Sequence, residues 1–291
     1  MRFYFSPHLQ LLRRNLLLSL QMYMNTNRQI DILGIINLTD DSYFSQSRCT
    51  SLETALSLAG RHVAEGASIL DIGACSTRPG AQTFGADEEW RRLEPALKAV
   101  REAFPDVRIS IDTVWASVVE RAYDLIGDFI VNDISAGEDD PAILPAAGRL
   151  GLGYIAMHKR GNPMTMNTLT DYEDVVQEVR RYFEEFALKA AAAGIRDWIV
   201  DPGFGFAKTI EQNYEMLRSL DSFGNIDGGR RVLVGISRKS MIYKALDITP
   251  EESLPATQVL HLKALENGAD MLRVHDVAEA ARTIALYRII S

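Results

Sequence analysis

Asp201-Pro-Gly-Phe-Gly-Phe-Ala-Lys208 follows a short apolar run at residues 198–200 and precedes a helix-like segment that begins at Ile210. An acidic residue thus stands where a buried strand is expected to end. The turn after it contains two glycines, which adopt backbone conformations that other residues avoid. A buried strand that ends on a polar residue before a glycine turn is typical of the active face of a parallel α/β protein.

Five further apolar runs of the chain also end on polar residues. These residues are Asn37, Asp112, Asn132, the pair Arg273 and His275, and Ser237-Arg238-Lys239. The carboxyl ends of parallel strands meet at one edge of a sheet or at one mouth of a barrel. The sequence therefore predicts that these side chains converge on a single site.

Apolar runs and helix-like segments alternate along the chain. The expected strands are residues 30–36, 68–72, 107–111, 129–131, 153–157, 198–200, 232–236 and 270–274. The expected helices are residues 52–65, 87–104, 115–126, 140–150, 172–193, 210–221, 238–246, 253–267 and 277–290. We expect Asp171 to cap the helix over 172–193, and Pro250 to join the segments 238–246 and 253–267 as a first-turn proline.

Eight strand–helix units at this length predict an α/β protein with one (β/α)8 TIM-barrel domain over residues 30–291. An open doubly wound sheet is the alternative. The first helix does not open with Gly-x-Gly-x-x-Gly, which counts against a dinucleotide-binding sheet. The chain has 291 residues, of which 47% are hydrophobic, and a mean hydropathy of −0.06. This composition suffices for a large core.

The chain is acidic, with a formal net charge of −8 and a pI near 5.2. This balance argues against nucleic acid or an anionic membrane as a partner, so residues that bind an anion must form a local group. The two cysteines, Cys49 and Cys75, lack metal-site spacing and make no disulfide framework. We therefore expect a reducing compartment, the cytoplasm.

Residues 1–29 precede the first regular pattern. Arg13-Arg14 and the apolar run at 16–20 faintly resemble a signal peptide, but no cleavage site follows and the run is too short to span a bilayer. We expect a disordered or mis-started extension, with Met22 or Met24 as the true start, and export as the alternative.

Seven motifs of the chain resemble those of the dihydropteroate synthases, in that family's order. They are Gly34-Ile-Ile-Asn-Leu-Thr, Ser76-Thr-Arg-Pro-Gly80, Asp112-Thr113, Asn132-Asp133, Asp201-Pro-Gly-Phe-Gly-Phe206, Gly235-Ile-Ser-Arg-Lys-Ser240 and Arg273-Val-His-Asp276. The similarity covers residues 30–290. It implies condensation of 6-hydroxymethyl-7,8-dihydropterin diphosphate with p-aminobenzoate, giving dihydropteroate and diphosphate in folate biosynthesis. It also implies a sulfonamide target.

A pterin presents an amino group and a ring N–H side by side, and one carboxylate accepts both. Asp112 and Asp201 are the candidates for this role, and Asn132 can bind the same ring edge. The alternative is that either aspartate caps the helix that follows it. The resemblance adds further residues to the pterin pocket, namely Met157, Phe206, Gly235, Lys239 and Arg273. Core packing is the alternative for Met157 and for one of Phe204 and Phe206.

An anion site is expected beside the pterin pocket. Arg273 and His275 are two apart on one strand, so they point to the same face. Residues 237–240 open the helix that follows the seventh expected strand, where N–H groups favour phosphate. The resemblance implies diphosphate contacts by Asn37, Thr77, Arg273 and His275, and Mg²⁺ held by Asn37 with few other protein ligands. A surface salt bridge is the alternative for Arg238, and a structural role for His275.

The resemblance places the p-aminobenzoate pocket at Thr77, Arg78, Pro79, Phe206, Lys239 and Ser240. Residues 38–48 and 73–84 match two mobile loops of the family, which close as lids. The first loop departs from the family pattern at Asp40 and Gln46, and Cys75 stands where glutamate is common. A solvated linker is the alternative for this loop.

The resemblance implies a reaction without a covalent enzyme intermediate, in a homodimer, with Asp112, Asp201, Lys239, Arg273 and His275 as catalytic residues. Two other functions are compatible with such a barrel. A corrinoid-dependent pterin methyltransferase is expected to lack the Ser-Thr-Arg-Pro and Ser-Arg-Lys-Ser motifs that this chain has. A catalytically silent binding homologue has only the altered first loop in its favour.

Overall fold

Eight parallel strands form the centre of the molecule. The computed structural model describes residues 28–38, 52–74, 85–161 and 165–291. The strands are β1 (Asp31–Asn37), β2 (Ile69–Gly73), β3 (Arg108–Asp112), β4 (Ile130–Asp133), β5 (Gly153–Met157), β6 (Trp198–Asp201), β7 (Leu233–Val234) and β8 (Met271–Val274). Their order is β6-β5-β4-β3-β2-β1-β8-β7. A parallel bridge between Val200 and Val232 joins the two ends, so the sheet closes into the predicted barrel.

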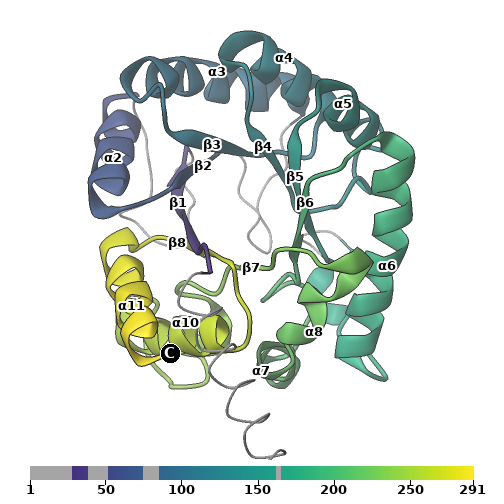
Figure 1. Cartoon of the computed structure of the whole chain (residues 1–291), viewed down its shortest axis with the longest axis vertical. Coiled ribbons are helices and arrows are strands. Elements are labelled where there is room, and N and C mark those ends of the chain that lie inside the picture. Colours follow the sequence, from purple (N-terminus) through teal and green to yellow (C-terminus); the bar gives the residue numbers. More distant parts are fainter. Residues whose placement is uncertain (1–27, 39–51, 75–84, 162–164) are drawn as a thin grey trace, which may run out of the picture.

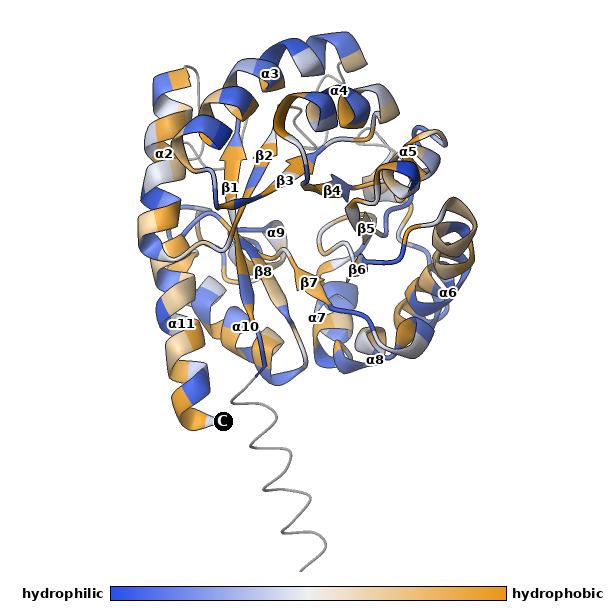
Figure 2. Cartoon of the chain, turned by 45° about the horizontal axis from the view of Figure 1, so that its top comes forward, coloured by the Kyte–Doolittle hydropathy of each residue, from blue (hydrophilic) through white to orange (hydrophobic). Residues whose placement is uncertain are grey.

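Helices follow the strands and surround them (Figure 1). They are α2 (Leu52–Glu65), α3 (Ala86–Ala103), α4 (Ala116–Ile126), α5 (Ile143–Leu150), α6 (Val175–Ala193), α7 (Ile210–Arg218), α8 (Asp221–Gly224), α9 (Ser240–Tyr243), α10 (Leu254–Glu266) and α11 (Val277–Ile290). Two short 3₁₀ helices are η2 (Met166–Thr168) and η3 (Ile226–Gly228). Figure 2 shows polar and apolar residues alternating on the helices, as expected for helices with one face on the strands.

Two local predictions were wrong. The helix expected over 172–193 is α6, and its cap is Asp174, whose side chain accepts the N–H of Gln177 at 2.9 Å. Asp171 lies outside this helix. Pro250 stands in the loop before α10, and the proline in the first turn is Pro255. The carbonyl of Pro250 instead accepts Arg238 at 2.9 Å, which fixes it as a loop residue.

The barrel interior is built in layers, because side chains alternate between the two faces of each strand. One apolar layer of the interior consists of Leu33, Ile69, Ile155, Ile199, Leu233 and Met271. A larger apolar cluster fills the space between the strands and the helices. The small interior layer forms a floor, and four predicted site residues lie two positions after its members, namely Met157, Asp201, Gly235 and Arg273.

An ion cluster lies at the amino-terminal end of the barrel. Asp31, the first residue of β1, accepts Arg108 at 2.5 Å and Arg231 at 2.8 Å. Burial raises the pKa of Asp31, but the bonds from Arg231 and Ser68 and the charge of Arg108 outweigh this effect and lower it. Polar groups at this end of a TIM barrel serve stability, since active sites lie at the other end. None of the helices in the described ranges is long and apolar enough to cross a bilayer.

Candidate active site

The residues predicted for the site come together at the carboxyl ends of the strands. Ile69, Ile155, Ile199, Leu233 and Met271 of the floor are followed two positions later by Asp71, Met157, Asp201, Gly235 and Arg273. Asp112 and Asn132 are direct register partners on β3 and β4. Because a step of two residues keeps a side chain on the same face, all these groups point into one mouth above the floor.

Arg273 on β8 lies between two carboxylates. Its Nε donates to Asp71 at 2.6 Å, and its Nη2 donates to Asp112 at 2.9 Å. Asp71 also accepts the side-chain amide of Asn132 at 3.1 Å. Gly73 leaves room for this network, since a Cβ there would lie 3.0 Å from the Cβ of Asp112. Four strands thus contribute to one hydrogen-bonded group.

Two carboxylates face one guanidinium in this network, so one negative charge is left uncompensated. Burial raises the pKa of Asp112 to about 7; Arg273 opposes this rise and Asp71 adds to it. Burial also lowers the pKa of Arg273, but the charges of Asp71 and Asp112 outweigh this and raise it. The mouth therefore contains a carboxyl that ionises near neutral pH beside a permanent cation.

Asp201 and Lys239 are a second acid and base at the mouth, and each affects the pKa of the other. Burial raises the pKa of Asp201 and the charge of Lys239 opposes this rise. Burial lowers the pKa of Lys239 to about 8, and Asp201 opposes that change. Lys239 Nζ donates to the carbonyl of Phe204 and lies 4.8 Å from the ring centroid of Phe206. The ammonium is therefore held over the ring of the Asp201 loop.

The two phenylalanines of this loop have different surroundings. Phe204 is fully buried in the large apolar cluster, whereas Phe206 is half-buried at the mouth. Gly205 between them has a φ of +81°, and a Cβ there would lie 3.2 Å from Cδ of Lys239. The glycine thus permits both the turn and the close approach of the lysine. Phe204 is therefore a core residue, whereas Phe206 lies at the mouth beside Lys239.

Neither aspartate caps the helix that follows it. Thr209 caps α7 in a capping box with Gln212. The residue before α4 is Trp115, which makes no side-chain cap. The carboxylate of Asp201 instead accepts the N–H of Gly203 at 2.8 Å, and this bond shapes the turn of its own loop. The same carboxylate is close enough to Lys239 for each group to affect the other's pKa.

His275 lies beyond Arg273 on the same side of the barrel. Ser237 Oγ accepts the backbone N–H of His275 at 3.3 Å and lies 3.0 Å from its Nδ1. A proton donated by this hydroxyl to Nδ1 leaves the ring proton on Nε2. Burial and the charge of Arg273 lower the pKa of His275 to about 3, so the imidazole is neutral at pH 7. It is a hydrogen-bond donor rather than a cation.

Arg238 is a buried structural residue and not a surface one. Its guanidinium binds both carboxylate oxygens of Asp276, at 2.8 and 2.9 Å, and the carbonyls of Pro250 and Glu251. This side chain connects the loops after β7 and β8. The helix predicted over 238–246 is wrong in length, because α9 has only four residues. A helix dipole therefore adds little positive potential here, and Lys239 and Arg273 are the cations of the mouth.

Asn37, Gly235 and Ser240 also lie at the carboxyl end. Asn37 ends β1 beside Gly73 and is half-buried. A Cβ on Gly235 would lie 3.8 Å from Arg273 and 3.9 Å from Lys239 Nζ. Ser240 is the first residue of α9, directly after Lys239. In the part of the chain that the structure describes, no three His, Cys, Asp or Glu side chains form a metal site.

The side-chain amide of Asn37 fits a mode of Mg²⁺ binding in which the protein supplies few ligands. Mg²⁺ commonly keeps several waters and binds through one or two protein groups together with substrate phosphates. The half-buried position of Asn37 at the mouth, on the strand adjacent to that of Arg273, is compatible with this mode. It is not compatible with a preformed protein cage among the described residues.

Some predicted residues lie outside the described part of the chain. They are Thr77, Arg78, Pro79, Asp40, Gln46 and Cys75. Two further polar residues were missed by the sequence analysis. Asp71 stands inside an apolar strand, and Lys208 at the end of the motif that opens with Asp201. The alternation of side chains along a strand is the signal that points to Asp71, because it lies two positions after Ile69 of the floor and so on the same face.

The site can now be compared with those of known proteins. The model of a family described as pterin binding enzyme matches residues 33–275. A dihydropteroate synthase of Synechocystis sp. is 42% identical over 265 residues, covering 90% of each chain. The dihydropteroate synthase of Escherichia coli is 38% identical over 255 residues, covering 87% of this chain and 89% of its own.

Solved structures agree with these relatives. A Yersinia pestis dihydropteroate synthase with a sulfonamide drug complex superposes with a TM-score of 0.84 at 33% identity, covering 90% of this chain and 94% of its own. The Thermus thermophilus enzyme in complex with 4-aminobenzoate gives 0.80 at 37% identity, covering 90% and 95%. The barrel with its acidic and basic mouth is thus that of a pterin-binding enzyme. Within this class, the chain belongs to the dihydropteroate synthase family.

Proposed function

We propose that the mouth of this barrel condenses 6-hydroxymethyl-7,8-dihydropterin diphosphate with p-aminobenzoate, giving 7,8-dihydropteroate and diphosphate. Membership of the dihydropteroate synthase family supports the reaction. The observation that supports it most is the pairing of Asp71 and Asp112 with one guanidinium. That pairing leaves one negative charge for a ligand edge with two adjacent donors, and a pterin has such an edge.

The pterin ring lies on the acidic side of the mouth. Asp112 or Asp201 accepts the ring N–H and the neighbouring amino group, and Asn132 meets the same ring edge from β4. Met157 and Phe206 are the apolar walls. Met157 is 3% exposed and belongs to neither apolar cluster of the barrel, which suits a side chain reserved for a ligand. These groups fix the reacting carbon in the mouth.

The diphosphate lies on the basic side, next to Arg273, His275 and Lys239. Arg273 and Lys239 stabilise the charge that develops on the leaving oxygen, and His275 donates a hydrogen bond. Asn37 is the residue that would hold Mg²⁺, and the ion would supply positive charge to the diphosphate oxygens. The carbon–oxygen bond breaks with its electron pair on diphosphate, and the dihydropterin ring delocalises the positive charge that remains.

The amine of p-aminobenzoate is neutral at pH 7 and attacks the exposed carbon directly. A carbon–nitrogen bond forms, and the nitrogen then releases a proton to water. No strong base and no enzyme nucleophile are required for this step. Phe206, Lys239 and Ser240 contribute to the p-aminobenzoate pocket, together with Thr77, Arg78 and Pro79. A covalent adduct trapped on the protein would contradict this path.

The reaction is tested by a coupled assay of diphosphate release. Release by the wild-type chain is expected only when both substrates are present. A silent binding homologue would bind the pterin diphosphate but release nothing. A corrinoid-dependent methyltransferase would ignore p-aminobenzoate. Release that does not depend on p-aminobenzoate would refute the proposed condensation.

A homodimer and a cytoplasmic location belong to the same proposal. Exposed apolar side chains gather on two neighbouring helices, with Val259 on α10 and Leu286, Ile289 and Ile290 on α11. Their exposed fractions range from 59% to 79%. Figure 1 shows α10 and α11 side by side on the outside of the barrel. A second copy of the chain is the partner that would cover this face.

A further inference from the structure

Lys208 is a buried lysine outside the group of residues that meet the substrates. It is 8% exposed, and its Nζ has three hydrogen-bond partners, each at 3.0 Å: the carbonyls of Gly203 and Phe206 and Nδ1 of His158. An ammonium has three N–H donors, so these partners use all of them. A buried ammonium whose three donors are all hydrogen-bonded indicates a structural role.

The task concerns the backbone of the Asp201 loop. Gly203, Gly205 and Ala207 have φ values of +72°, +81° and +50°, so the loop has an uncommon backbone conformation at every second residue. The carbonyls that Lys208 binds belong to residues at the start and near the end of this stretch. The bonds therefore hold both ends of a turn that the chain does not favour by itself.

His158 fixes the lysine from the neighbouring strand end. A Cβ on Gly203 would lie 1.9 Å from the carbonyl oxygen of His158, so the loop packs directly on this residue. Burial, with the charges of Lys208 and Arg160, lowers the pKa of His158 well below its usual range. A neutral ring accepts at Nδ1 when its proton is on Nε2. Its outer side meets Tyr182 at 4.9 Å between ring centroids, edge to face.

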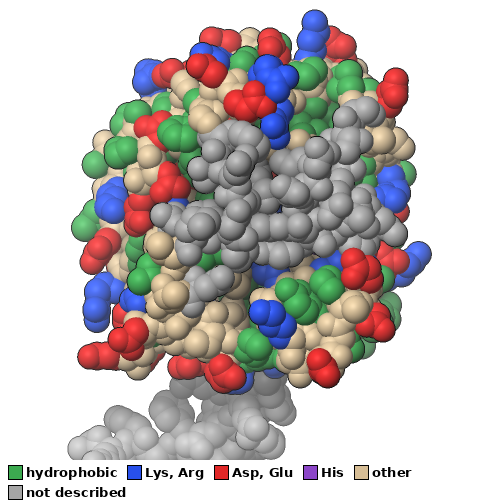
Figure 3. All heavy atoms as spheres, turned by 180° about the vertical axis from the view of Figure 1, so that it is seen from behind, with side chains coloured by type: hydrophobic (Ala, Val, Ile, Leu, Met, Phe, Trp, Pro, Cys, Tyr) green, Lys and Arg blue, Asp and Glu red, His purple; other side chains and the backbone are tan. Residues whose placement is uncertain are grey.

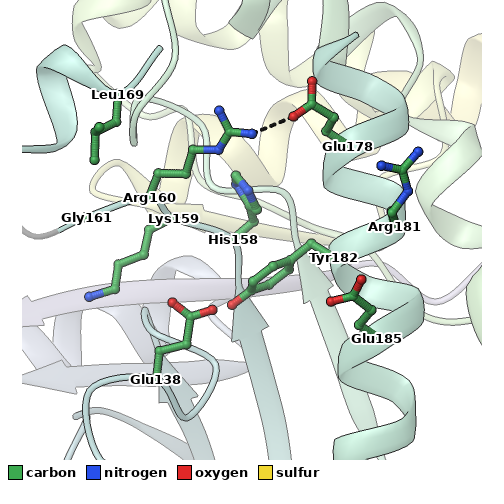
Figure 4. A pocket seen from close by; sticks show the side chains of 10 residues that line it. All are labelled: Glu138, His158, Lys159, Arg160, Gly161, Leu169, Glu178, Arg181, Tyr182 and Glu185. Carbon is green, nitrogen blue, oxygen red and sulfur yellow. Dashed lines mark hydrogen bonds and ion pairs between the residues drawn. The ribbon is translucent and has the colours of Figure 1, made fainter. Parts of the chain in front are cut away.

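Figure 4 shows that His158 and Tyr182 line a surface cavity outside the barrel mouth, together with Lys159 and Arg160. Lys159 gives a useful contrast with Lys208. It is also buried, at 6% exposed, but its Nζ binds Asp139 at 2.6 Å and none of the loop carbonyls. Of the two buried lysines, Lys208 therefore binds carbonyls of the Asp201 loop and Lys159 does not.

The loop held by Lys208 connects to two residues of the p-aminobenzoate side. The carbonyl of Phe204 binds Lys239, and the ring of Phe206 lies under the same ammonium. The pterin groups Asp112 and Asn132 are on strands β3 and β4, and Asp201 is the last residue of β6, so of the pterin groups only Phe206 is carried by the loop itself. A change at Lys208 should therefore affect the second substrate more than the first.

We propose that Lys208, held by His158, is a positioning residue that fixes the Asp201 loop and thereby places Phe206 and Lys239 for p-aminobenzoate. Lys208 touches neither substrate and acts through the backbone carbonyls that it binds. This inference rests on the proposed condensation. It means that Lys208 and His158 both contribute to the affinity for p-aminobenzoate.

The test compares Lys208→Met with Lys159→Met in steady-state kinetics and in calorimetry. A hydrogen bond to a buried charge contributes enough that Lys208→Met should raise KM for p-aminobenzoate by about tenfold. The dissociation constant of the pterin diphosphate should change by less than about threefold, because its hydrogen-bonding groups Asp112, Asn132 and Asp201 lie on strands and only its apolar wall Phe206 belongs to the loop. Lys159→Met should keep both values near those of the wild type.

A pair of variants at His158 tests the same point without removing the lysine. His158→Asn keeps an acceptor near the position of Nδ1 and should keep KM for p-aminobenzoate near the wild-type value. His158→Leu removes the acceptor and should raise it about threefold, as expected for one of three bonds. This pair decides the matter if Lys208→Met does not fold.

The pH profile is a further readout. Burial lowers the pKa of Lys208 to about 7, with Asp201 opposing and Lys239 and Arg160 adding to the change. As the pH rises through this value, the lysine loses one donor, so KM for p-aminobenzoate should rise. Lys239, facing the same loop, titrates at about 8 and remains in every variant. The rise in KM for p-aminobenzoate near pH 7 should be absent only in Lys208→Met.

Failure of the inference can be told apart from failure of the function. A wild-type chain that releases no diphosphate from the two substrates refutes the function. An active wild type with folded Lys208→Met of unchanged KM refutes the positioning role alone. Equal losses in Lys208→Met and Lys159→Met, or equal losses for the two substrates, would also overturn it.

Discussion

At the scale of single residues, the mouth is organised by an imbalance of charge. Asp71 and Asp112 share the guanidinium of Arg273, and no second cation neutralises the pair in the described network. Burial raises the pKa of Asp112 to about 7; Arg273 opposes this rise and the charge of Asp71 adds to it. A pterin edge with two N–H donors stabilises the ionised carboxylate by hydrogen bonds, so binding and ionisation of Asp112 are linked.

Binding of the pterin diphosphate is expected to weaken as the pH falls. The folded protein holds the pKa of Asp112 at about 7, above its ordinary value, so the acceptor carboxylate is lost below that pH. The affinity should fall by up to about tenfold per pH unit below 7, because Asp112 of the free enzyme is then protonated and must release its proton when the ligand binds. Calorimetry between pH 6 and 8 measures this, and Asp112→Asn should lack the change near pH 7.

Replacement of Asp71 tests the origin of that pKa. Asp71→Asn removes a neighbouring charge that adds to the effect of burial on the pKa of Asp112, so the pH dependence of pterin binding should move to lower pH. Activity should fall about tenfold, because Arg273 and Asn132 lose the charged acceptor that orients them. Ser110→Ala, a change of a buried neighbour on β3, serves as the control. A pH dependence unchanged in Asp71→Asn would contradict the shared network.

Sequence patterns predicted most of these residues but not their partners. Asp112, Asn132, Asp201 and Arg273 stand at strand ends, where a polar residue after an apolar run is conspicuous. Asp71 was missed because it lies within such a run, and only a contact across the barrel gives it meaning. Arg238 stands at a strand end but is structural, because it is buried against Asp276 of another loop, a contact that the local sequence does not show.

At the scale of elements, the strained turn after β6 is the part that differs most from ordinary structure. Gly203 and Gly205 adopt positive φ at little cost, but Ala207 does so at a φ of +50° with its side chain 1% exposed. A non-glycine residue in this region costs about 1 kcal/mol. The hydrogen bonds of Lys208 and Asn213 to the loop offset this cost.

Ala207→Gly is expected to relieve this strain. The free energy of unfolding should rise by at most about 1 kcal/mol, because the greater freedom of glycine in the unfolded chain offsets part of the gain. The corresponding shift in Tm is about 2 °C in a domain of this size. Thermal unfolding by calorimetry measures it. A clear loss of stability would show that Ala207 is not strained in the folded protein.

Element types were predicted more reliably than element ends. The alternation of strands and helices follows from hydrophobic periodicity, which a sequence shows directly. The choice of Asp174 over Asp171 as a cap depends on where Arg160 holds the preceding loop, at the carbonyl of Asp171. The shortness of α9 depends likewise on the buried ion pair of Arg238. Such tertiary contacts are not visible in local sequence.

At the scale of the whole molecule, the two ends of the barrel have different tasks. The ion cluster around Asp31 joins the strand starts, while the opposite end gathers the groups of the mouth. Figure 3 shows acidic and basic side chains interspersed over one face, without a continuous basic patch among the described residues that it displays. The positive groups of the site are therefore local to Lys239 and Arg273.

The apolar face of α10 and α11 gives a prediction about assembly. Leu286 is 59% exposed, and covering it by a second copy would make the chain a dimer in solution. Leu286→Glu should place a charge in that interface and yield a monomer in light scattering. Leu188→Glu is the matched control, because Leu188 is 74% exposed on the distant helix α6. A monomeric wild type would exclude the dimer.

The central claim is that one mouth holds the heterocycle by acids and the diphosphate by donors and cations beside them. Calorimetric titration of 6-hydroxymethylpterin and of inorganic diphosphate, as separate ligands, measures this most directly. Asp201→Asn should weaken the pterin at least about tenfold and leave diphosphate unchanged, whereas His275→Ala should do the reverse. If both variants weaken both ligands equally, or neither ligand responds, the division of the mouth into two subsites is wrong.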